Sequence, residues 1–185
     1  VTNAAITLTP MPGAGGTGIL KLTPANANNY PLGTDSNATV TIAPMVVSGQ
    51  KMEIAFKGYT GKSETLTNFP VLVVLSNNVG NSTFNYNNFL SPGGYDLRFV
   101  ANPGDTASLN YEIESWDYTG ASYVWVQVPE LPGNGTGVIY AKWGYPADSS
   151  QLPCTTNGAT WTNGFVIVAH MTETSGTTVS DSTAN

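Results

Sequence analysis

The sequence predicts an all-β protein: an antiparallel sandwich, jelly-roll-like or immunoglobulin-like, with additional terminal strands. Short runs rich in β-branched and aromatic residues recur along the chain, and Gly, Pro, Asn or Asp closes each of them, as is typical of strands. Several runs alternate apolar with polar residues, which is the pattern of a strand with one buried face. The stretch from Asp96 to Tyr145 holds consecutive runs of this kind and no apolar period typical of a helix.

We expect three parts in the chain. The first contains short strands at Ala5 to Thr9, Ile19 to Thr23 and Ala38 to Ala43, and is either a partial immunoglobulin-like repeat or a set of assembly strands. The second is the sandwich itself, and the third is a Ser/Thr-rich linker that ends in a C-terminal strand. The predicted boundaries are 1–48, 49–146 and 147–185.

In the predicted sandwich, Lys51 to Phe56 alternates, whereas Phe69 to Leu75 is almost continuously apolar. A continuous apolar run is typical of a strand covered on both faces, so we expect Phe69 to Leu75 to be the central strand. The asparagine-rich stretch 77–88 predicts a long exposed connection. Its rings, with the one that follows, would lie on the sheet edge: Phe84, Tyr86 and Phe89.

The four strands that follow have two different faces. In Leu109 to Trp116, the residues Asn110, Glu112, Glu114 and Trp116 share one face, because side chains alternate along a strand. In Tyr123 to Val128 the valines share a face, and Tyr123, Trp125 and Gln127 share the other. The remaining strands of this group are Asp96 to Val100 and Val138 to Tyr145.

Three blocks of this region carry a resemblance. They are Asp-Leu-Arg-Phe at Asp96 to Phe99, Tyr-Glu-Ile-Glu-Ser-Trp at Tyr111 to Trp116, and Trp-Val-Gln-Val-Pro at Trp125 to Pro129. Residues about 50–146 thereby resemble the domain of unknown function 2341 family, found in large secreted bacterial and archaeal proteins. This resemblance implies a β-fold and an extracellular setting, and it implies no particular activity.

Two weaker resemblances flank this region. The segment before it is similar to the end of a Calx-beta or other immunoglobulin-like repeat. The stretch Ala169 to Asn185 is similar to the opening strand of a laminin-G or concanavalin-like lectin domain. We therefore expect either that the chain is part of a longer polypeptide or that this last strand serves another purpose.

Composition narrows the partners. Charged residues make up 10% of the chain, against roughly 25% in ordinary soluble domains, so Thr, Ser, Asn and Gly must supply the polar surface. The net charge of −6 would repel a phosphate backbone, and we expect no nucleic-acid partner. No stretch reaches the ~20 apolar residues of a membrane span, and we expect no membrane insertion.

The start of the chain and its cysteine content bear on the compartment. The chain begins at Val1 without a leader, so we expect a signal sequence to have been removed or to lie upstream in a longer protein. We therefore predict a secreted or cell-surface location. Cys154 is the single cysteine, which excludes an intramolecular disulfide, and we interpret it as a small half-buried side chain.

Glu112 and Glu114 are the close carboxylate pair of this sequence. Because they are two residues apart on a strand, they share a face, and their Cα atoms lie about 6.5–7 Å from each other. Their flexible side chains could approach the carboxylate separations found in glycosidases. The basic residue Arg98 lies on the preceding strand, and a hairpin between the two strands would bring it close. We predict that Arg98 forms an ion pair with Glu112 or Glu114; a metal or sugar contact and hydrolysis are the alternatives.

The other polar candidates predict no catalytic centre. His170 is the single histidine, so no multi-histidine metal site is possible, and no Gly-x-Ser-x-Gly elbow accompanies it. We expect neither catalysis nor a required cofactor. Calcium remains an alternative, through carboxylates with backbone carbonyls, at Asp96, Asp117 and Asp181.

Aromatic rings and sequons predict surface roles. Four aromatic rings near the junction of two predicted strands could form a platform on which sugar rings stack. They belong to Trp116, Tyr118, Tyr123 and Trp125. Alternatively, the N-terminal segment or a loop could cover one or both tryptophans. Candidate N-glycosylation sites lie in or beside turns, at Asn37, Asn81 and Asn134.

We expect a non-enzymatic structural or adhesive module of a secreted cell-surface or matrix protein. Its partners would be other copies of itself or neighbouring domains of a longer chain. An orphan strand exposes unpaired backbone groups and seeks another sheet edge, so we predict fibre assembly by strand addition. The candidate strand presents Phe165, Ile167, Ala169 and Met171. The alternative is a carbohydrate-binding module, with a polysaccharide partner for the aromatic sheet face.

Overall fold

The computed structural model describes residues 16–21, 37–42, 49–58, 61 and 63–185. The predicted strand at Ala5 to Thr9 lies outside these residues. Strands β1 (Gly16–Lys21) and β2 (Asn37–Ile42) form an antiparallel pair of their own. They correspond to the predicted strands at Ile19 to Thr23 and Ala38 to Ala43, with shifted ends.

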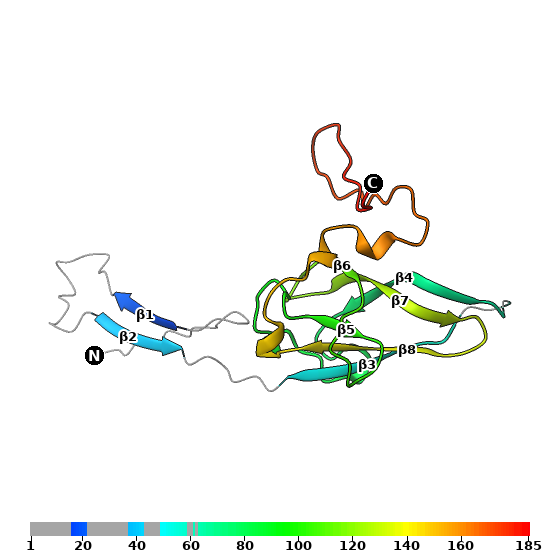
Figure 1. Cartoon of the computed structure of the whole chain (residues 1–185). Coiled ribbons are helices and arrows are strands. Elements are labelled where there is room, and N and C mark those ends of the chain that lie inside the picture. Colours follow the sequence, from blue (N-terminus) through cyan, green and yellow to red (C-terminus); the bar gives the residue numbers. More distant parts are fainter. Residues whose placement is uncertain (1–15, 22–36, 43–48, 59–60, 62) are drawn as a thin grey trace.

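The main body consists of two three-stranded antiparallel sheets that face each other (Figure 1). The first has the order β3 (Gln50–Phe56), β8 (Gly137–Trp143), β5 (Arg98–Val100). The second has the order β4 (Thr65–Leu75), β7 (Ser122–Pro132), β6 (Tyr111–Ser115). The helices are single 3-10 turns, and the predicted all-β sandwich is confirmed.

The sandwich core is unusually rich in aromatic rings. Trp143 of β8 is fully buried and stacks on Phe89, with ring centroids 5.8 Å apart and an interplanar angle of 13°. Phe84 packs between Trp143 and Tyr86, at centroid distances of 4.9 and 5.1 Å. Aromatic pairs at these distances contribute beyond their area burial, so this cluster is a main source of cohesion between the sheets.

The asparagine-rich connection supplies much of that core, which the sequence did not predict. Phe84, Tyr86 and Phe89 are 0%, 2% and 1% exposed. The Tyr86 hydroxyl donates to the Leu75 carbonyl oxygen at 2.8 Å, which anchors the connection at the end of β4. The polar residues between the rings stay outside, so the connection closes one end of the sandwich with its aromatic side chains.

Two predicted strand relationships were wrong. Among the strands that the structure describes, β4 pairs with β7 alone, so it lies at an edge of its sheet and not at the centre of the core. Its apolar run is not covered on both faces. Val73 and Leu75 face the core, whereas Leu72 and Val74 are 39% and 44% exposed. β5 and β6 do not form a hairpin, because β5 pairs with β8 in the first sheet and β6 pairs with β7 in the second.

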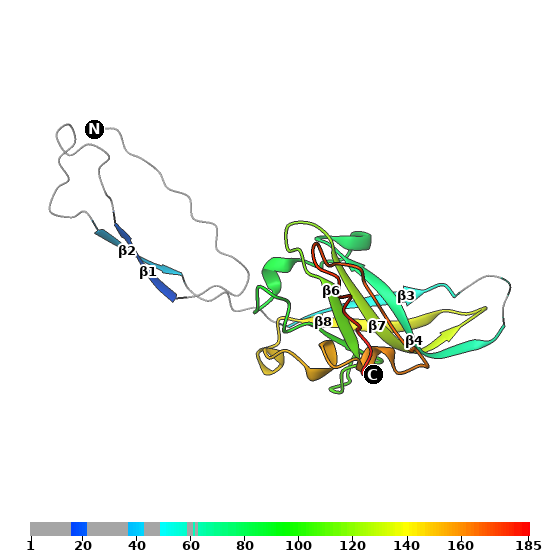
Figure 2. The ribbon, with the colours of Figure 1, turned by 90° about the horizontal axis from the view of Figure 1, so that it is seen from above.

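The C-terminal segment, residues 164–185, crosses the outer face of the β4–β7–β6 sheet (Figures 1 and 2). The predicted strand at 164–171 has no ladder hydrogen bonds among the residues that the structure describes, and it is not a strand there. Instead the segment doubles back on itself, and the Ser182 amide donates to the Val168 carbonyl oxygen at 2.8 Å. Within the described residues, no helix is long and apolar enough to span a bilayer.

Candidate functional site

The best-defined polar cluster lies where the C-terminal segment meets the outer face of β6. We call Glu112, Glu114 and His170 the histidine clamp. His170 Nε2 lies 3.0 Å from Glu112 Oε1, and His170 Nδ1 lies 3.5 Å from Glu114 Oε2. The three side chains are only 14%, 26% and 14% exposed for Glu112, Glu114 and His170. One imidazole therefore bridges two carboxylates and fixes the segment to the sheet.

A β-bulge determines the geometry of the clamp. Ile113 lies opposite Val124 and Ser115 lies opposite Tyr123, so Glu114 is the extra residue of β6. A bulge bends its strand and re-aims side chains. Glu112 projects from the outer face, and the extra residue lets Glu114 reach the same histidine from its other side.

Two tryptophans hold the carboxylates in place. The indole N–H of Trp161 donates to Glu112 Oε2, and that of Trp125 donates to Glu114 Oε2, each at 2.6 Å. The two rings are 5.3 Å apart, centroid to centroid. The Ser182 hydroxyl donates to Glu112 Oε1 at 2.8 Å. Glu112 thus accepts from three groups, two of them in the C-terminal segment.

The turn that carries Trp161, Ala159–Trp161, is itself bound to the sheet. Gln127 of β7 donates from Nε2 to the Thr160 carbonyl oxygen at 3.2 Å and to Thr162 Oγ1 at 2.8 Å. Asn110 donates from Nδ2 to the Ala159 carbonyl oxygen at 3.2 Å. The outer face of β7, for which the sequence left a ligand surface and a face covered by the protein itself as alternatives, is therefore largely used to bind the protein's own chain.

Gly158 allows the end of the segment to pack against this turn. Its φ of 78° is in the left-handed region, and a Cβ there would lie 2.4 Å from the Ala184 amide nitrogen. Only glycine adopts this conformation without strain, and only glycine leaves room for the chain end. The absence of a side chain at Gly158 therefore lets the turn lie in direct contact with residues 183–184.

Asp181 organises the return of the segment. Its carboxylate accepts from the amides of Val168 and Thr183, at 3.0 and 2.9 Å, and from the Thr183 hydroxyl. The Val168 and Thr183 amides hold the pKa of Asp181 below its usual value, because they favour the ionised form. An exposed carboxylate thus closes the loop that follows His170.

The predicted partner of the carboxylate pair is elsewhere. Arg98 is 5% exposed and donates to the carbonyl oxygens of Asp148 and Ser150, at 2.7 and 2.6 Å. Its Nε lies 3.7 Å from Asp148 Oδ1. The prediction that Arg98 pairs with Glu112 or Glu114 does not hold, because β5 and β6 belong to different sheets. Arg98 instead secures the loop after β8.

The predicted aromatic platform is divided between different environments. Because of the bulge, Trp116 turns toward the core rings, 5.2 Å from Tyr86 and 5.1 Å from Phe89, and its N–H donates to the Pro92 carbonyl oxygen. Trp125 lies under the C-terminal segment. The remaining two rings are the accessible ones, with Tyr118 38% and Tyr123 41% exposed.

The aspartates considered for calcium are occupied by N–H and O–H donors. Asp96 is fully buried and accepts from the amides of Leu90, Ser91 and Gly144. Asp117 accepts from the amide and hydroxyl of Thr119, which lower its pKa. In the part of the chain that the structure describes, no group of three or more His, Cys, Asp or Glu residues is arranged to hold a metal ion.

The remaining candidates are mostly at the surface. Asn81 and Asn134 are exposed, the first in a 3-10 turn and the second between β7 and β8. Asn37 begins β2. In the candidate assembly segment, Ile167 and Met171 are 66% and 71% exposed. Ala169 is exposed as well, whereas Phe165 packs its ring on Trp161.

Residues 93–181 match the family model described as Domain of unknown function (DUF2341). The predicted resemblance is confirmed. The DUF2341 match begins and ends later than the range predicted from the sequence, and it includes the whole histidine clamp and Asp181. Residues 164–181 of the C-terminal segment thus lie within the matched range, and Ser182 lies just beyond it. No curated protein and no solved structure matches the chain.

Sequence reasoning missed two members of the cluster, Trp161 and Ser182. Both lie in Ser/Thr-rich stretches without strand periodicity. The available signal was a tryptophan in an otherwise polar loop, since a large ring there usually has a surface to cover. Nothing local to the sequence indicates that its partner would be Glu112.

Proposed function

We propose that this DUF2341 protein is a non-enzymatic structural module of a secreted cell-surface or matrix protein. It would join neighbouring β-domains or copies of itself through strand addition by residues 164–171. One observation carries the proposal. The segment is held to its own molecule through Phe165 on Trp161 and through His170 on Glu112, and yet Val166, Ile167 and Met171 are 79%, 66% and 71% exposed.

The backbone of this run supports the same conclusion. Between Phe165 and Met171, the hydrogen bonds within the described chain involve Val168, His170 through its side chain, and the Val166 carbonyl oxygen. Several amides and carbonyl groups are thus left for another strand. Exposed apolar side chains next to unpaired backbone groups are the features that make a strand edge associate.

The anchors favour a structural role over a catalytic one. The carboxylates of Glu112 and Glu114 accept from His170, Trp125, Trp161 and Ser182. A glycosidase needs one free carboxylic acid and one free carboxylate facing the substrate. Here both groups serve to bind the protein's own segment.

Light scattering of the purified chain as a function of concentration tests the proposal. We expect the mean mass to rise with concentration for the wild type and to stay monomeric for Ile167→Lys. Thr177→Lys, an exposed polar position of the same segment, is the matched control and should associate like the wild type. A wild-type protein that stays monomeric at every concentration would refute the proposal.

Carbohydrate binding is the second candidate, and the exposure of Tyr118 and Tyr123 favours it. Exposed tyrosines can stack on the apolar face of a sugar ring. Affinity electrophoresis in gels with embedded polysaccharides is the test. Retardation that Tyr123→Ala abolishes would support this function, and unaltered migration in every gel would remove it.

A further inference from the structure

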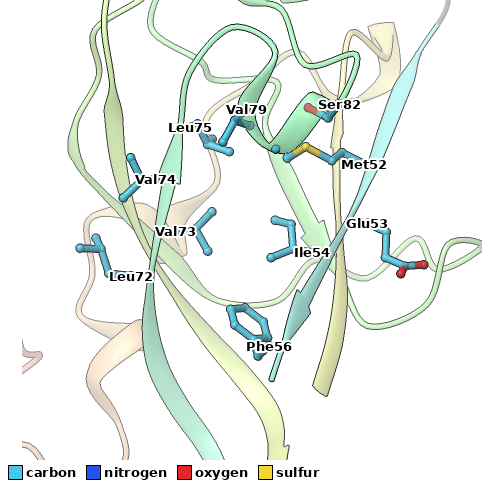
Figure 3. A pocket seen from close by; sticks show the side chains of 11 residues that line it. Met52, Glu53, Ile54, Phe56, Leu72, Val73, Val74, Leu75, Val79 and Ser82 are labelled. Carbon is cyan, nitrogen blue, oxygen red and sulfur yellow. The ribbon is translucent and has the colours of Figure 1, made fainter. Parts of the chain in front are cut away.

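An apolar cleft opens between the two sheets on the side where β3 and β4 are the outermost strands (Figure 3). Its volume is about 290 Å³. Apolar side chains of both strands and of the turn after β4 point into it, as Figure 3 shows. The main lining residues are Met52, Ile54, Phe56, Val73, Leu75 and Val79.

In the part of the chain that the structure describes, residues 51–56 of β3 and the length of β4 have no neighbouring strand on their outer edges. Among the described strands, β3 pairs with β8 only and β4 with β7 only. A strand edge that has a neighbour on one side presents a row of N–H and C=O groups on the other. An apolar cleft flanked by such edges is a site for an extended apolar segment, because side chains can enter the cleft while the backbone pairs with an edge strand.

The chain itself contains a segment with the matching properties. Residues 165–171 form neither helix nor strand in their own molecule, carry no acidic or basic side chain other than His170, and leave Val166 and Ile167 largely exposed. The run is as long as β3, which has 7 residues. The cleft lining is equally poor in charge, with Glu53 as its one charged residue.

The segment does not lie in the cleft of its own molecule. The histidine clamp holds it on the outer face of the β4–β7–β6 sheet, and Asn163 donates to the Thr67 carbonyl oxygen of β4 at 3.2 Å. The cleft lies between the sheets, on the inner side of β4. The segment, as the donor of a strand, and the cleft, as its acceptor, therefore lie on different surfaces of one molecule. This is the arrangement of a heterologous, head-to-tail contact.

We propose that the β3/β4 cleft of one molecule accepts residues 165–171 of a second copy. This inference rests on the proposed strand addition and names its acceptor. Repetition of such a contact gives an open filament if the rotation does not close and a ring if it does. The clamp has a defined part in this assembly, because it presents the donor segment in a fixed direction on the opposite surface.

Complementation between two variants tests the acceptor. Met52→Lys places a charge in the lining of the cleft, and Ile167→Lys disables the donor segment. We expect each variant alone to be monomeric by light scattering. An equimolar mixture should form dimers that do not extend, because one intact donor meets one intact acceptor. Val138→Lys, at a position of β8 that is 37% exposed and outside the cleft lining, should assemble like the wild type.

The outcomes separate the two proposals. Wild-type assembly that persists in Met52→Lys, or a mixture that stays monomeric, would overturn the cleft as acceptor and leave strand addition itself standing. A wild type that never assembles would overturn both. If Met52→Lys does not fold, as judged by its thermal transition, Val79→Lys tests the same cleft from the other side.

Discussion

His170 Nε2 lies 3.0 Å from Glu112 Oε1 across a separation of 58 residues in the chain. With Glu114 on its second nitrogen, the ring joins a segment without regular structure to a rigid sheet. Hydrogen bonds to charged groups stabilise by about 1.5–3 kcal/mol. A segment with few backbone pairs of its own is thus kept in place by side chains.

Replacing His170 by alanine should release the C-terminal segment without unfolding the sandwich. Two largely buried carboxylates would lose their bridging partner, and residues 165–182 would exchange amide hydrogens faster. Hydrogen exchange by mass spectrometry measures this directly. We expect a loss of about 1.5–3 kcal/mol in local opening free energy. Thr177→Ala in the same segment is the control, and equal protection in both variants would contradict the role of the clamp.

The two glutamates should contribute unequally. Glu112 accepts from Trp161, His170 and Ser182, whereas Glu114 accepts from Trp125 and lies farther from the histidine. Glu112→Gln should therefore loosen the segment more than Glu114→Gln does, because it weakens three contacts. A double-mutant cycle with His170→Ala isolates each pairwise coupling. A larger coupling for Glu114 would reverse this assignment.

Acid should loosen the segment through Asp181. Hydrogen bonds from backbone amides lower the pKa of this carboxyl from its ordinary 3.8 in the folded state. A lowered pKa means that the stabilisation is present above pH 3.8 and is lost as the pH falls through the folded pKa. Exchange protection at Val168 should fall in that acidic range. Asp181→Asn should lack this pH dependence, and an unchanged acid profile would contradict the assignment.

Much of the fold could be predicted from the sequence, since strand periodicity is a local property. The β-branched and aromatic runs gave the positions of β3 and β6 to β8, and the resemblance at Asp96 to Pro129 indicated the family. The burial of Phe84 and Tyr86 depends on how the connection packs against the sheets, and the asparagine-rich composition of the connection does not indicate that packing. The bulge at Glu114 could not be predicted either, and it separated Trp116 from Trp125.

The candidate site was the least predictable part. Its carboxylates were found as a same-face pair, because a period of two places Glu112 and Glu114 together. Their partner depends on a segment that folds back over the sheet, and no local pattern encodes that path. Arg98 is nearer to Glu112 in the sequence than His170 is, but its strand β5 belongs to the other sheet of the sandwich.

The ring cluster of the asparagine-rich connection should be essential for stability. Phe84→Ala would leave a cavity between Tyr86, Phe89 and Trp143, and we expect a loss of about 3–5 kcal/mol in the free energy of unfolding. Urea denaturation followed by tryptophan fluorescence measures it. Asn87→Ala, at an exposed position of the same connection, should cost far less. Comparable losses in both variants would show that the rings do not form the core.

Alkaline conditions should destabilise the sandwich through Tyr111. This tyrosine is 1% exposed and donates to the Leu97 carbonyl oxygen at 2.6 Å. Burial raises its pKa above the ordinary 10.0, because the phenolate is poorly solvated there. A raised folded pKa means that stability is full below pH 10.0 and declines as the pH rises beyond it.

Tyr111→Phe separates this titration from the packing of the ring. At neutral pH the free energy of unfolding of the variant should be lower by about 1 kcal/mol, because phenylalanine cannot make the hydrogen bond. Its stability should fall less steeply between neutral pH and strong alkali. Burial also raises the pKa of Tyr86, so Tyr86 should account for part of the remaining slope. Urea midpoints measured across this range give the comparison. Parallel profiles for wild type and variant would assign the alkaline loss to other groups.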